Sequence, residues 1–340
     1  MKSIQIPSVG KVEIIDLPTP SISSEEVLIK INYVGFCGSD LNTFRGCNPL
    51  AKSSVIPGHE ISGAVACIGE SVPEGIFSIG MKVTVNPYTS CGKCSSCRHN
   101  RENACRDNMT LGVQRDGAMC EYIAVPWSKV IPTGGITEEH IALIEPMSVG
   151  FHAVDRGNVS DIDTVMVIGC GMIGIGAIVR ANMRGAKVVA VDIDDEKLSL
   201  ARLLGASYTI NSLTDDIHQR LIEITDNNGP DVVIEAVGSP ATYQMAVDEV
   251  AFTGRVVCIG YSKIDVSFHT KLFVQKELDI RGSRNANPSD FVAVAKYLQR
   301  TTSPIDELIS KIIQPEEAED TLSKWSIMPG RIFRILVKFN

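Results

Sequence analysis

The sequence predicts an α/β protein in which a doubly wound parallel sheet follows a β-rich region. In the first third of the chain, short β-rich runs are separated by prolines. From about residue 164, apolar strands alternate with helical patterns, as in successive βαβ units. A glycine-rich turn, Gly169-Cys170-Gly171-Met172-Ile173-Gly174, joins the first of these strands to the first helix.

The composition limits the classes of protein to which the chain can belong. With 340 residues it is too long for one ordinary core, so two domains are expected. A formal net charge of -8 argues against a nucleic-acid-binding surface. No apolar stretch is long enough to span a bilayer and residues 1–10 contain no apolar leader, so we expect a cytoplasmic protein. Ten cysteines in such a protein suggest metal binding before disulfides.

The expected secondary structure follows from the period of the apolar residues. In the β-rich region, strands are predicted at residues 12–15, 26–31 and 83–85. The βαβ series is predicted as strands at 164–168, 187–192, 231–235 and 255–259, with helices at 171–184, 195–204 and 241–250. A last strand is predicted at 331–338.

The glycine-rich turn predicts a dinucleotide site. Gly169 permits the tight turn, Gly171 lets a pyrophosphate approach the helix N-terminus, and Gly174 allows the helix to pack closely on the sheet. Asp192 ends the second strand, where a carboxylate accepts hydrogen bonds from ribose hydroxyls and repels a 2′-phosphate. We therefore expect NAD, held at the turn by Gly169, Gly171, Met172, Ile173 and Gly174, with Asp192 at the ribose. The alternative is that these glycines only pack a helix.

Four cysteines with the spacing C-x2-C-x2-C-x7-C predict a closed zinc site. They are Cys91, Cys94, Cys97 and Cys105. Four thiolates leave no open coordination position, so this zinc would be structural. The segment has no apolar periodicity with which to hold itself together. Two disulfides or four unrelated thiols are the alternatives.

Further motifs give the whole chain a resemblance to a known family. Residues 58–72 contain Gly58-His59-Glu60-x2-Gly63-x5-Gly69-x2-Val72, which is similar to the zinc signature of the zinc-dependent medium-chain dehydrogenases. Residues 143–150, with Glu145, resemble the sorbitol-dehydrogenase pattern of the polyol and sugar-acid branch, in which Glu replaces a Cys ligand. The resemblance implies a GroES-like β-barrel catalytic domain of residues 1–148 and 283–340. It also implies a Rossmann NAD-binding domain of residues 149–282.

The resemblance also implies a second, catalytic zinc. Its ligands would be Cys37, His59 and either Glu60 or Glu145, and the zinc would act on the substrate alcohol as a Lewis acid. Ser39 and Glu60 are the candidate catalytic residues, and Ser39 is placed to pass on the proton of that alcohol. Asn42 stands where family members often carry a relay histidine, so the proton must leave through the cofactor ribose, water or another group.

The substrate is less clearly indicated by the sequence. Arg284 and Asn285 follow the Rossmann region, and Arg45 follows Ser39; both segments resemble those of bacterial hexonate dehydrogenases. A guanidinium suits a substrate carboxylate, which favours L-gulonate or L-galactonate oxidised at C5. Alternatively Arg284 binds cofactor phosphate or a neighbouring acid, and Arg45 is a solvated loop residue.

Alternative activities and assemblies remain open at this point. A neutral polyol dehydrogenase and an L-threonine 3-dehydrogenase are alternatives within the family, and a non-catalytic zinc- and nucleotide-binding regulator is an alternative of another class. We expect a homodimer or homotetramer, because the apolar strand at residues 254–259 would form a sheet edge that a second subunit covers.

Overall fold

The computed structural model describes residues 1–52, 54–328 and 332–339. The chain divides into two compact units. Unit 1 comprises Met1–Glu145 and Asn287–Asn340, and unit 2 comprises Pro146–Ala286. The first boundary lies inside helix α4 (Ile144–Arg156), and the second lies after strand β13 (Asp279–Gly282).

Unit 1 is built on a seven-stranded sheet around the long strand β3 (Glu26–Phe36). The strand order is β14-β15-β3-β4-β5-β7, and β6 also pairs with β3. The other strands are β4 (Glu60–Ile68), β5 (Lys82–Val85), β6 (Tyr122–Pro126), β7 (Val130–Pro132), β14 (Lys311–Ile313) and β15 (Ile335–Lys338), with β1 (Lys2–Gln5) and β2 (Glu13–Asp16) forming a separate pair. Strands β4, β6 and β15 all pair with β3 antiparallel, so β3 connects distant parts of the chain.

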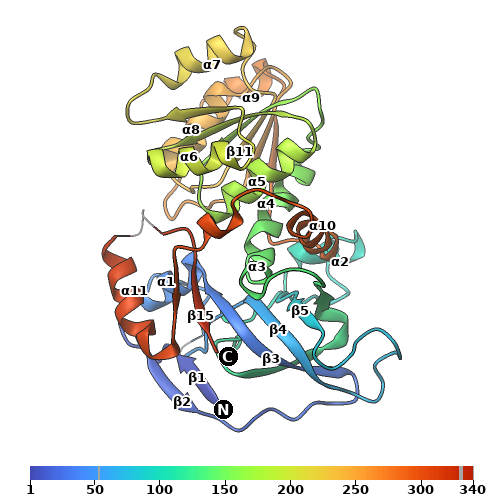
Figure 1. Cartoon of the computed structure of the whole chain (residues 1–340). Coiled ribbons are helices and arrows are strands. Elements are labelled where there is room, and N and C mark those ends of the chain that lie inside the picture. The colour runs from blue at the N-terminus through green and yellow to red at the C-terminus, as the bar shows by residue number, and fades with distance from the viewer. Residues whose placement is uncertain (53, 329–331, 340) are drawn as a thin grey trace. The chain divides into compact units, whose positions relative to one another are not determined.

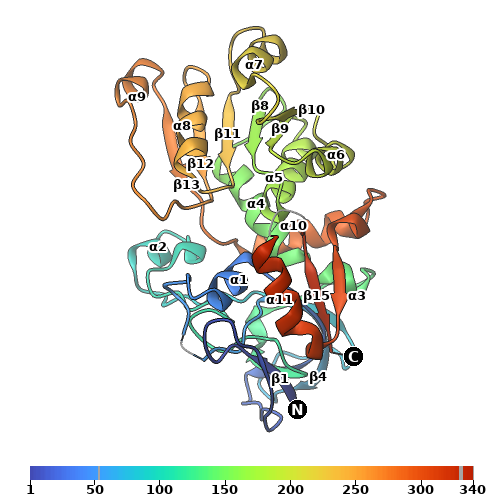
Figure 2. The same ribbon diagram turned by 90° about the vertical axis from the view of Figure 1, so that its left-hand side faces the viewer.

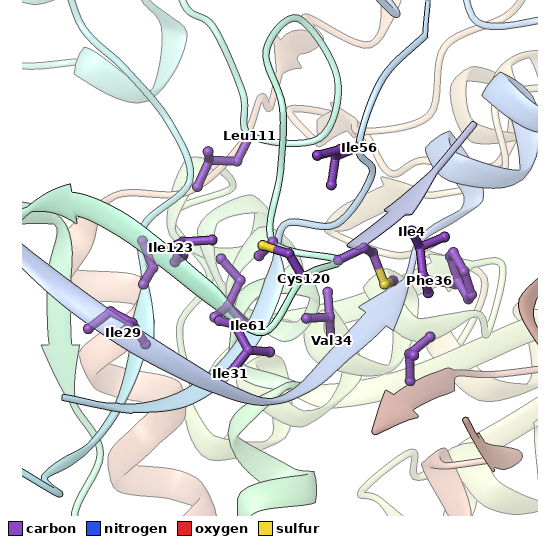
Figure 3. Packing of buried hydrophobic residues seen from close by; sticks show 14 of the residues in the cluster. Ile4, Ile29, Ile31, Val34, Phe36, Ile56, Ile61, Leu111, Cys120 and Ile123 are labelled. Carbon is purple, nitrogen blue, oxygen red and sulfur yellow. The ribbon is translucent and has the colours of Figure 1, made fainter. Parts of the chain in front are cut away.

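The core of unit 1 lies along β3. Ile29, Ile31, Val34 and Phe36 are fully buried there and pack against β4 and residues 119–123 (Figure 3). Burying each such side chain stabilises the fold by about 1.5–3 kcal/mol. Helix α11 (Ala318–Ile327) adds Trp325 to the same cluster, so the late segment of the chain belongs to this core.

Short helices complete unit 1. They are α1 (Gly38–Phe44), α2 (Ser95–Arg98), α3 (Glu138–Ile141), α10 (Pro288–Leu298) and the 3₁₀ turns η1 (Glu102–Ala104), η2 (Trp127–Lys129), η3 (Ile305–Leu308) and η4 (Pro315–Glu317). Helices α1 and α11 lie side by side in both views (Figures 1 and 2).

Unit 2 is a six-stranded parallel sheet in the order β10-β9-β8-β11-β12-β13 (Figure 2). Its strands are β8 (Thr164–Ile168), β9 (Lys187–Asp192), β10 (Tyr208–Asn211), β11 (Val232–Glu235), β12 (Arg255–Cys258) and β13. In chain order this is the 3-2-1-4-5-6 arrangement of a Rossmann sheet, so the predicted fold class is confirmed. The order reverses between β8 and β11, which places the crevice for a dinucleotide at the carboxyl ends of these strands.

Helices cover both faces of this sheet. The helices that follow β8 in unit 2 are α5 (Met172–Met183), α6 (Asp195–Leu203), α7 (Ile217–Thr225), α8 (Pro240–Glu249) and the short α9 (Lys271–Gln275), which has no buried residue. Leu221 of α7 and Ala246 of α8 pack with Met166 and Ile168 on one face. Gly174 of α5 adjoins Val167, whose side chain points to the opposite face.

Two predictions about strands need correction. The strand predicted at residues 254–259 does not form the edge of the sheet, because β13 pairs with β12 on its outer side. The edge is β13, which the sequence analysis did not identify because its exposed residues leave no apolar run. The last strand begins at Ile335, later than the predicted residue 331, which lies outside the described residues. In the described part of the chain, no helix has both the length and the apolar character needed to cross a bilayer.

Candidate metal centres and cofactor site

The four cysteines of the C-x2-C-x2-C-x7-C segment converge in unit 1. The sulfur atoms of Cys91, Cys94, Cys97 and Cys105 all lie within 4.8 Å of one another. Cys94 Sγ is 3.5 Å from Cys97 Sγ and 3.8 Å from Cys105 Sγ, so these thiols are not joined as disulfides. Sulfurs at about 3.8 Å are the corners of a tetrahedron with zinc–sulfur bonds of about 2.3 Å. The donor set fits a structural zinc.

Electrostatics in this lobe also fit a cation. A hydrogen bond with Ser96 and backbone hydrogen bonds lower the pKa of Cys94 to about 5, which favours its thiolate. Burial and the neighbouring thiols raise the pKa of Cys97 to about 12. The protein groups alone therefore do not stabilise four thiolates at neutral pH, and a divalent cation would supply the missing charge.

A second cluster of metal-ligating side chains lies between β3 and β4. Cys37 follows β3 and is the N-cap residue of α1, His59 immediately precedes β4, and Glu60 is the first residue of β4. One ligand atom from each of these three side chains lies within 4.8 Å of the other two. Asp40 fixes the Cys37 turn, because its carboxylate accepts a 2.8 Å hydrogen bond from the Cys37 backbone N–H.

This cluster contains polar atoms that the described residues do not satisfy. His59 is 5% exposed and Glu60 is fully buried, yet His59 Nδ1 and both Glu60 oxygens lack a hydrogen-bond partner in the described part of the chain. Buried polar atoms are normally paired, so His59 Nδ1 and Glu60 Oε1 indicate a missing partner, whereas Glu60 Oε2 lies beside the Arg334 side chain. Thiolate, imidazole and carboxylate are the ligand types that zinc takes in catalytic sites.

The charges of the cluster depend on one another. Burial raises the pKa of Cys37, but the hydrogen bond and charge of His59 outweigh it and lower the value to about 7. Burial lowers the pKa of His59, but Cys37 and nearby carboxylates raise it well above its ordinary value. Each of these two side chains therefore favours the charged form of the other.

Arg334, just before β15, is the cation of this region and was not identified by the sequence analysis. Its Nε lies 3.1 Å from Glu60 Oε2, and its Nη1 donates a 2.7 Å hydrogen bond to the Phe36 carbonyl. The side chains of Arg334 and Glu60 are 5% and 0% exposed. Burial raises the pKa of Glu60 well above its ordinary value, and the charge of Arg334 opposes that rise.

Glu145, the other candidate ligand, lies near this cluster but has a different partner. It is the second residue of α4, is 4% exposed, and accepts a short hydrogen bond from the Tyr88 hydroxyl. Its negative charge raises the pKa of His59, which shows that it lies within electrostatic range. The sequence analysis did not identify Tyr88 as a residue of this region, because a single tyrosine after β5 belongs to no motif.

The remaining predicted residues of unit 1 lie on α1 and its end. Ser39 is half-buried near the start of the helix, and its hydroxyl has no hydrogen-bond partner among the described residues. Asn42 lies one turn later and is half-buried. Arg45 is the C-cap residue, and its guanidinium donates to the side chain and carbonyl of Ser326 at the end of α11. These contacts give Arg45 a role within unit 1 and do not support the predicted substrate role.

The glycine turn of unit 2 has the predicted position between β8 and α5. Gly169 has a φ of +94°, which favours glycine, and a Cβ on Gly174 would overlap the Gly169 carbonyl oxygen. Gly171 is the N-cap residue, and a Cβ there would meet no atom within 4 Å. Met172 and Ile173 begin α5, whose first backbone N–H groups point toward this open space.

Asp192 is fixed at the end of β9, beside the glycine turn. One carboxylate oxygen accepts a 2.6 Å hydrogen bond from the Cys170 backbone N–H, and the other accepts a 2.7 Å bond from that of Ile193. Asp192 as a whole is half-buried. Arg284 and Asn285 follow β13 in the same unit; Arg284 is exposed, and Asn285 has a φ of +54°.

Known proteins resemble this chain over most of its length. Residues 23–135 match the family model of the alcohol dehydrogenase GroES-like domain, and residues 173–300 match that of the zinc-binding dehydrogenases. Sorbitol dehydrogenase of Bacillus subtilis is 34% identical over 349 residues, covering 100% of this chain and 98% of that protein. L-galactonate-5-dehydrogenase of Escherichia coli is 31% identical over 295 residues, covering 87% of this chain and 86% of that protein. The crystal structure of the E. coli alcohol dehydrogenase rspB with NADH has a TM-score of 0.91 at 28% identity, covering 100% of this chain and 99% of the other.

Proposed function

This chain belongs to the zinc-type alcohol dehydrogenases and is an oxidoreductase of the polyol and sugar-acid branch, and on this premise we propose that it oxidises a sugar acid with NAD. The proposed substrate is L-gulonate or L-galactonate, oxidised at C5 to a keto-hexuronate. Neutral polyols and L-threonine are the alternative substrates.

The buried group of Cys37, His59 and Glu60 carries the proposal. These residues, with Glu145 as the alternative carboxylate, would hold a catalytic zinc, and Cys91, Cys94, Cys97 and Cys105 a structural one. When bound at the first site, zinc supplies Lewis acidity that brings the pKa of a substrate alcohol toward neutrality.

Proton transfer would begin at Ser39. Its buried hydroxyl oxygen has no partner among the described residues, so it would accept a hydrogen bond from a substrate alcohol and take up its proton while the hydroxyl's own proton passes to the next carrier. Asn42 has an amide in place of a titratable group, so it does not carry that proton further. The next carrier would be a cofactor ribose hydroxyl or water.

The cofactor site favours NAD. The open space at Gly171 and the N-terminus of α5 suit a pyrophosphate, and the Asp192 carboxylate suits two unmodified ribose hydroxyls. Residues 193–195 contain no cation to receive a 2′-phosphate. The nicotinamide would accept the hydride that leaves the substrate carbon.

Arg284 supports the choice of a sugar acid. It is exposed directly after β13, and a bidentate guanidinium–carboxylate contact contributes about 1.5–3 kcal/mol. That energy corresponds to roughly tenfold to hundredfold in kcat/KM. One relative, L-galactonate-5-dehydrogenase, is named for such a substrate, and another is named for sorbitol, so both classes belong in the test.

The test compares substrates that differ only in the carboxylate. Sorbitol is L-gulonate with its carboxylate reduced to a hydroxymethyl group, and galactitol is related to L-galactonate in the same way. NADH formation should be at least about tenfold more efficient with each acid than with its hexitol. Arg284→Ala should remove most of that ratio, and Arg45→Ala should leave it intact. Better turnover of sorbitol, galactitol or L-threonine by the wild-type enzyme would reject the sugar-acid assignment.

A further inference from the structure

The two carboxylates near the candidate catalytic site are held differently. Among the described residues, Cys37, His59 and Glu60 each have a ligand atom within 4.8 Å of the other two. Glu145 does not belong to this group. Glu145 is nevertheless buried and close enough to influence the pKa of His59. Its Oε1 accepts the hydrogen bond from Tyr88, so the Tyr88 hydroxyl occupies one side of this carboxylate.

Tyr88 is held firmly in place. It is 5% exposed, and its backbone N–H donates a 3.1 Å hydrogen bond to Asn86 Oδ1. Its ring meets that of Phe291 edge to face, with centroids 6.3 Å apart and an interplanar angle of 73°. Its hydroxyl donates to Glu145 Oε1, the role that a neutral phenol takes beside a carboxylate.

We propose that Tyr88 is a positioning residue that holds the Glu145 carboxylate away from the catalytic metal. This inference rests on the proposed function, because it requires that the site bind zinc. Three protein ligands and one open position are what a catalytic zinc needs. A second carboxylate on the metal would fill the position that the substrate alcohol requires.

Loss of the Tyr88 hydroxyl changes which partner is most favourable for the Glu145 carboxylate. A buried carboxylate that loses a hydrogen-bond donor is less stable, and a divalent cation nearby is the strongest replacement partner. The Tyr88→Phe protein should therefore let Glu145 move onto the metal. The phenyl ring that this substitution leaves in place would still pack on Phe291, so the variant removes the hydroxyl and little else.

The chain offers a matched control in the same unit. Tyr33 also donates from its hydroxyl to a glutamate, Glu139 Oε1, at 2.8 Å, and it is 5% exposed. Glu139 belongs to α3 and is in neither group of metal-ligating side chains found among the described residues. Tyr33→Phe therefore removes the same kind of hydrogen bond without a route to the metal.

The experiment measures the metal directly. Protein loaded with zinc is mixed with a chromophoric chelator, and the catalytic zinc of Tyr88→Phe should leave at least about tenfold more slowly than that of the wild type, the scale on which outer partners tune metal sites. Cobalt substituted at this site should change its visible spectrum in Tyr88→Phe and not in Tyr33→Phe. In the Glu145→Gln background, Tyr88→Phe should have no further effect on either measurement.

Three outcomes overturn the inference. In the first, Tyr88→Phe releases zinc at the wild-type rate and keeps the wild-type cobalt spectrum. In the second, Tyr88→Phe releases zinc faster than the wild type. In the third, Glu145→Gln loses the catalytic zinc, which would make Glu145 a ligand. The last measurement decides the question even if Tyr88→Phe fails to fold. A wild-type protein that binds zinc only at the four cysteines would instead reject the proposed function.

Discussion

Gly35 on β3 lies directly opposite Glu60 on β4 in the antiparallel register, and a Cβ on Gly35 would overlap the Glu60 carboxylate. The sheet therefore makes room for a buried carboxylate by omitting a side chain on the neighbouring strand. Arg334 then approaches Glu60 from the segment that leads into β15.

Gly35→Ala should displace Glu60 and weaken the catalytic metal site. Overpacking a buried position costs about 1–3 kcal/mol, and the moved carboxylate would no longer lie beside Cys37 and His59. Metal analysis should find close to one zinc per chain in place of two, with a lower melting temperature. Gly134→Ala is the control, because a Cβ there meets no atom within 4 Å. Two retained zinc ions in Gly35→Ala would contradict this account.

Arg334→Leu should destabilise unit 1 strongly in the metal-free protein. It leaves Glu60 buried without its cation, and breaking a buried ion pair in this way costs about 3–5 kcal/mol. Adding Glu60→Gln should recover part of that loss, because the uncompensated charge is removed. Denaturant unfolding followed by tryptophan fluorescence suits the measurement, since both tryptophans, Trp127 and Trp325, belong to unit 1. Additive effects of the two substitutions would argue against a coupled pair.

The two zinc ions should differ in lability. Four thiolates would close the cysteine site, whereas the Cys37 site offers one thiolate and would leave a coordination position open. A mild chelator should abolish NADH formation while the circular dichroism spectrum stays unchanged, and a stronger one should then remove the second zinc. Activity and structure lost together at one chelator concentration would refute this division of roles.

Asp192→Ala should narrow the preference for NAD over NADP. The carboxylate that accepts N–H groups of the turn would also repel a 2′-phosphate, and its removal leaves space at the ribose. The ratio of kcat/KM for the two cofactors is the measurement, with Asp194→Ala as a neighbouring carboxylate control. Equal use of NAD and NADP by the wild type would show that Asp192 does not discriminate.

The chain should form a homodimer or homotetramer through β13. This strand is the edge of the parallel sheet, and its Ile280 is 47% exposed. Sedimentation should give a species at least twice the chain mass of 36.8 kDa. Ile280→Asp should shift it toward the monomer, and Ile162→Asp, at another exposed isoleucine of unit 2, should not. A wild-type protein that sediments only as a monomer at micromolar concentration would exclude the assembly.

Local patterns account for what the sequence could predict. The glycine turn after β8 and the cysteine lobe each lie within a few residues of chain, and strands β8 and β9 have the predicted bounds because they are continuous apolar runs. The prediction that Cys37 and His59 bind a metal came from the family resemblance, since neither residue indicates a metal by itself.

Contacts between distant segments account for what the sequence could not predict. Arg334 and Phe36 are 298 residues apart, and no periodicity connects them. Tyr88 reaches Glu145 across 57 residues through folding alone. Strand β13 was not recognised because an exposed edge strand lacks the apolar run that marks a buried one.

The pairing of β15 with β3 has a consequence for the order of events during synthesis. Unit 2 is one continuous segment and can complete its sheet while the ribosome is still adding later residues. Unit 1 cannot, because β3 must wait for β15, and Glu60 for Arg334, until the segment that follows unit 2 has been translated. The nascent chain therefore can acquire a folded nucleotide-binding unit before it acquires the arginine beside its candidate metal ligands, and catalytic competence must wait for the segment that follows this unit.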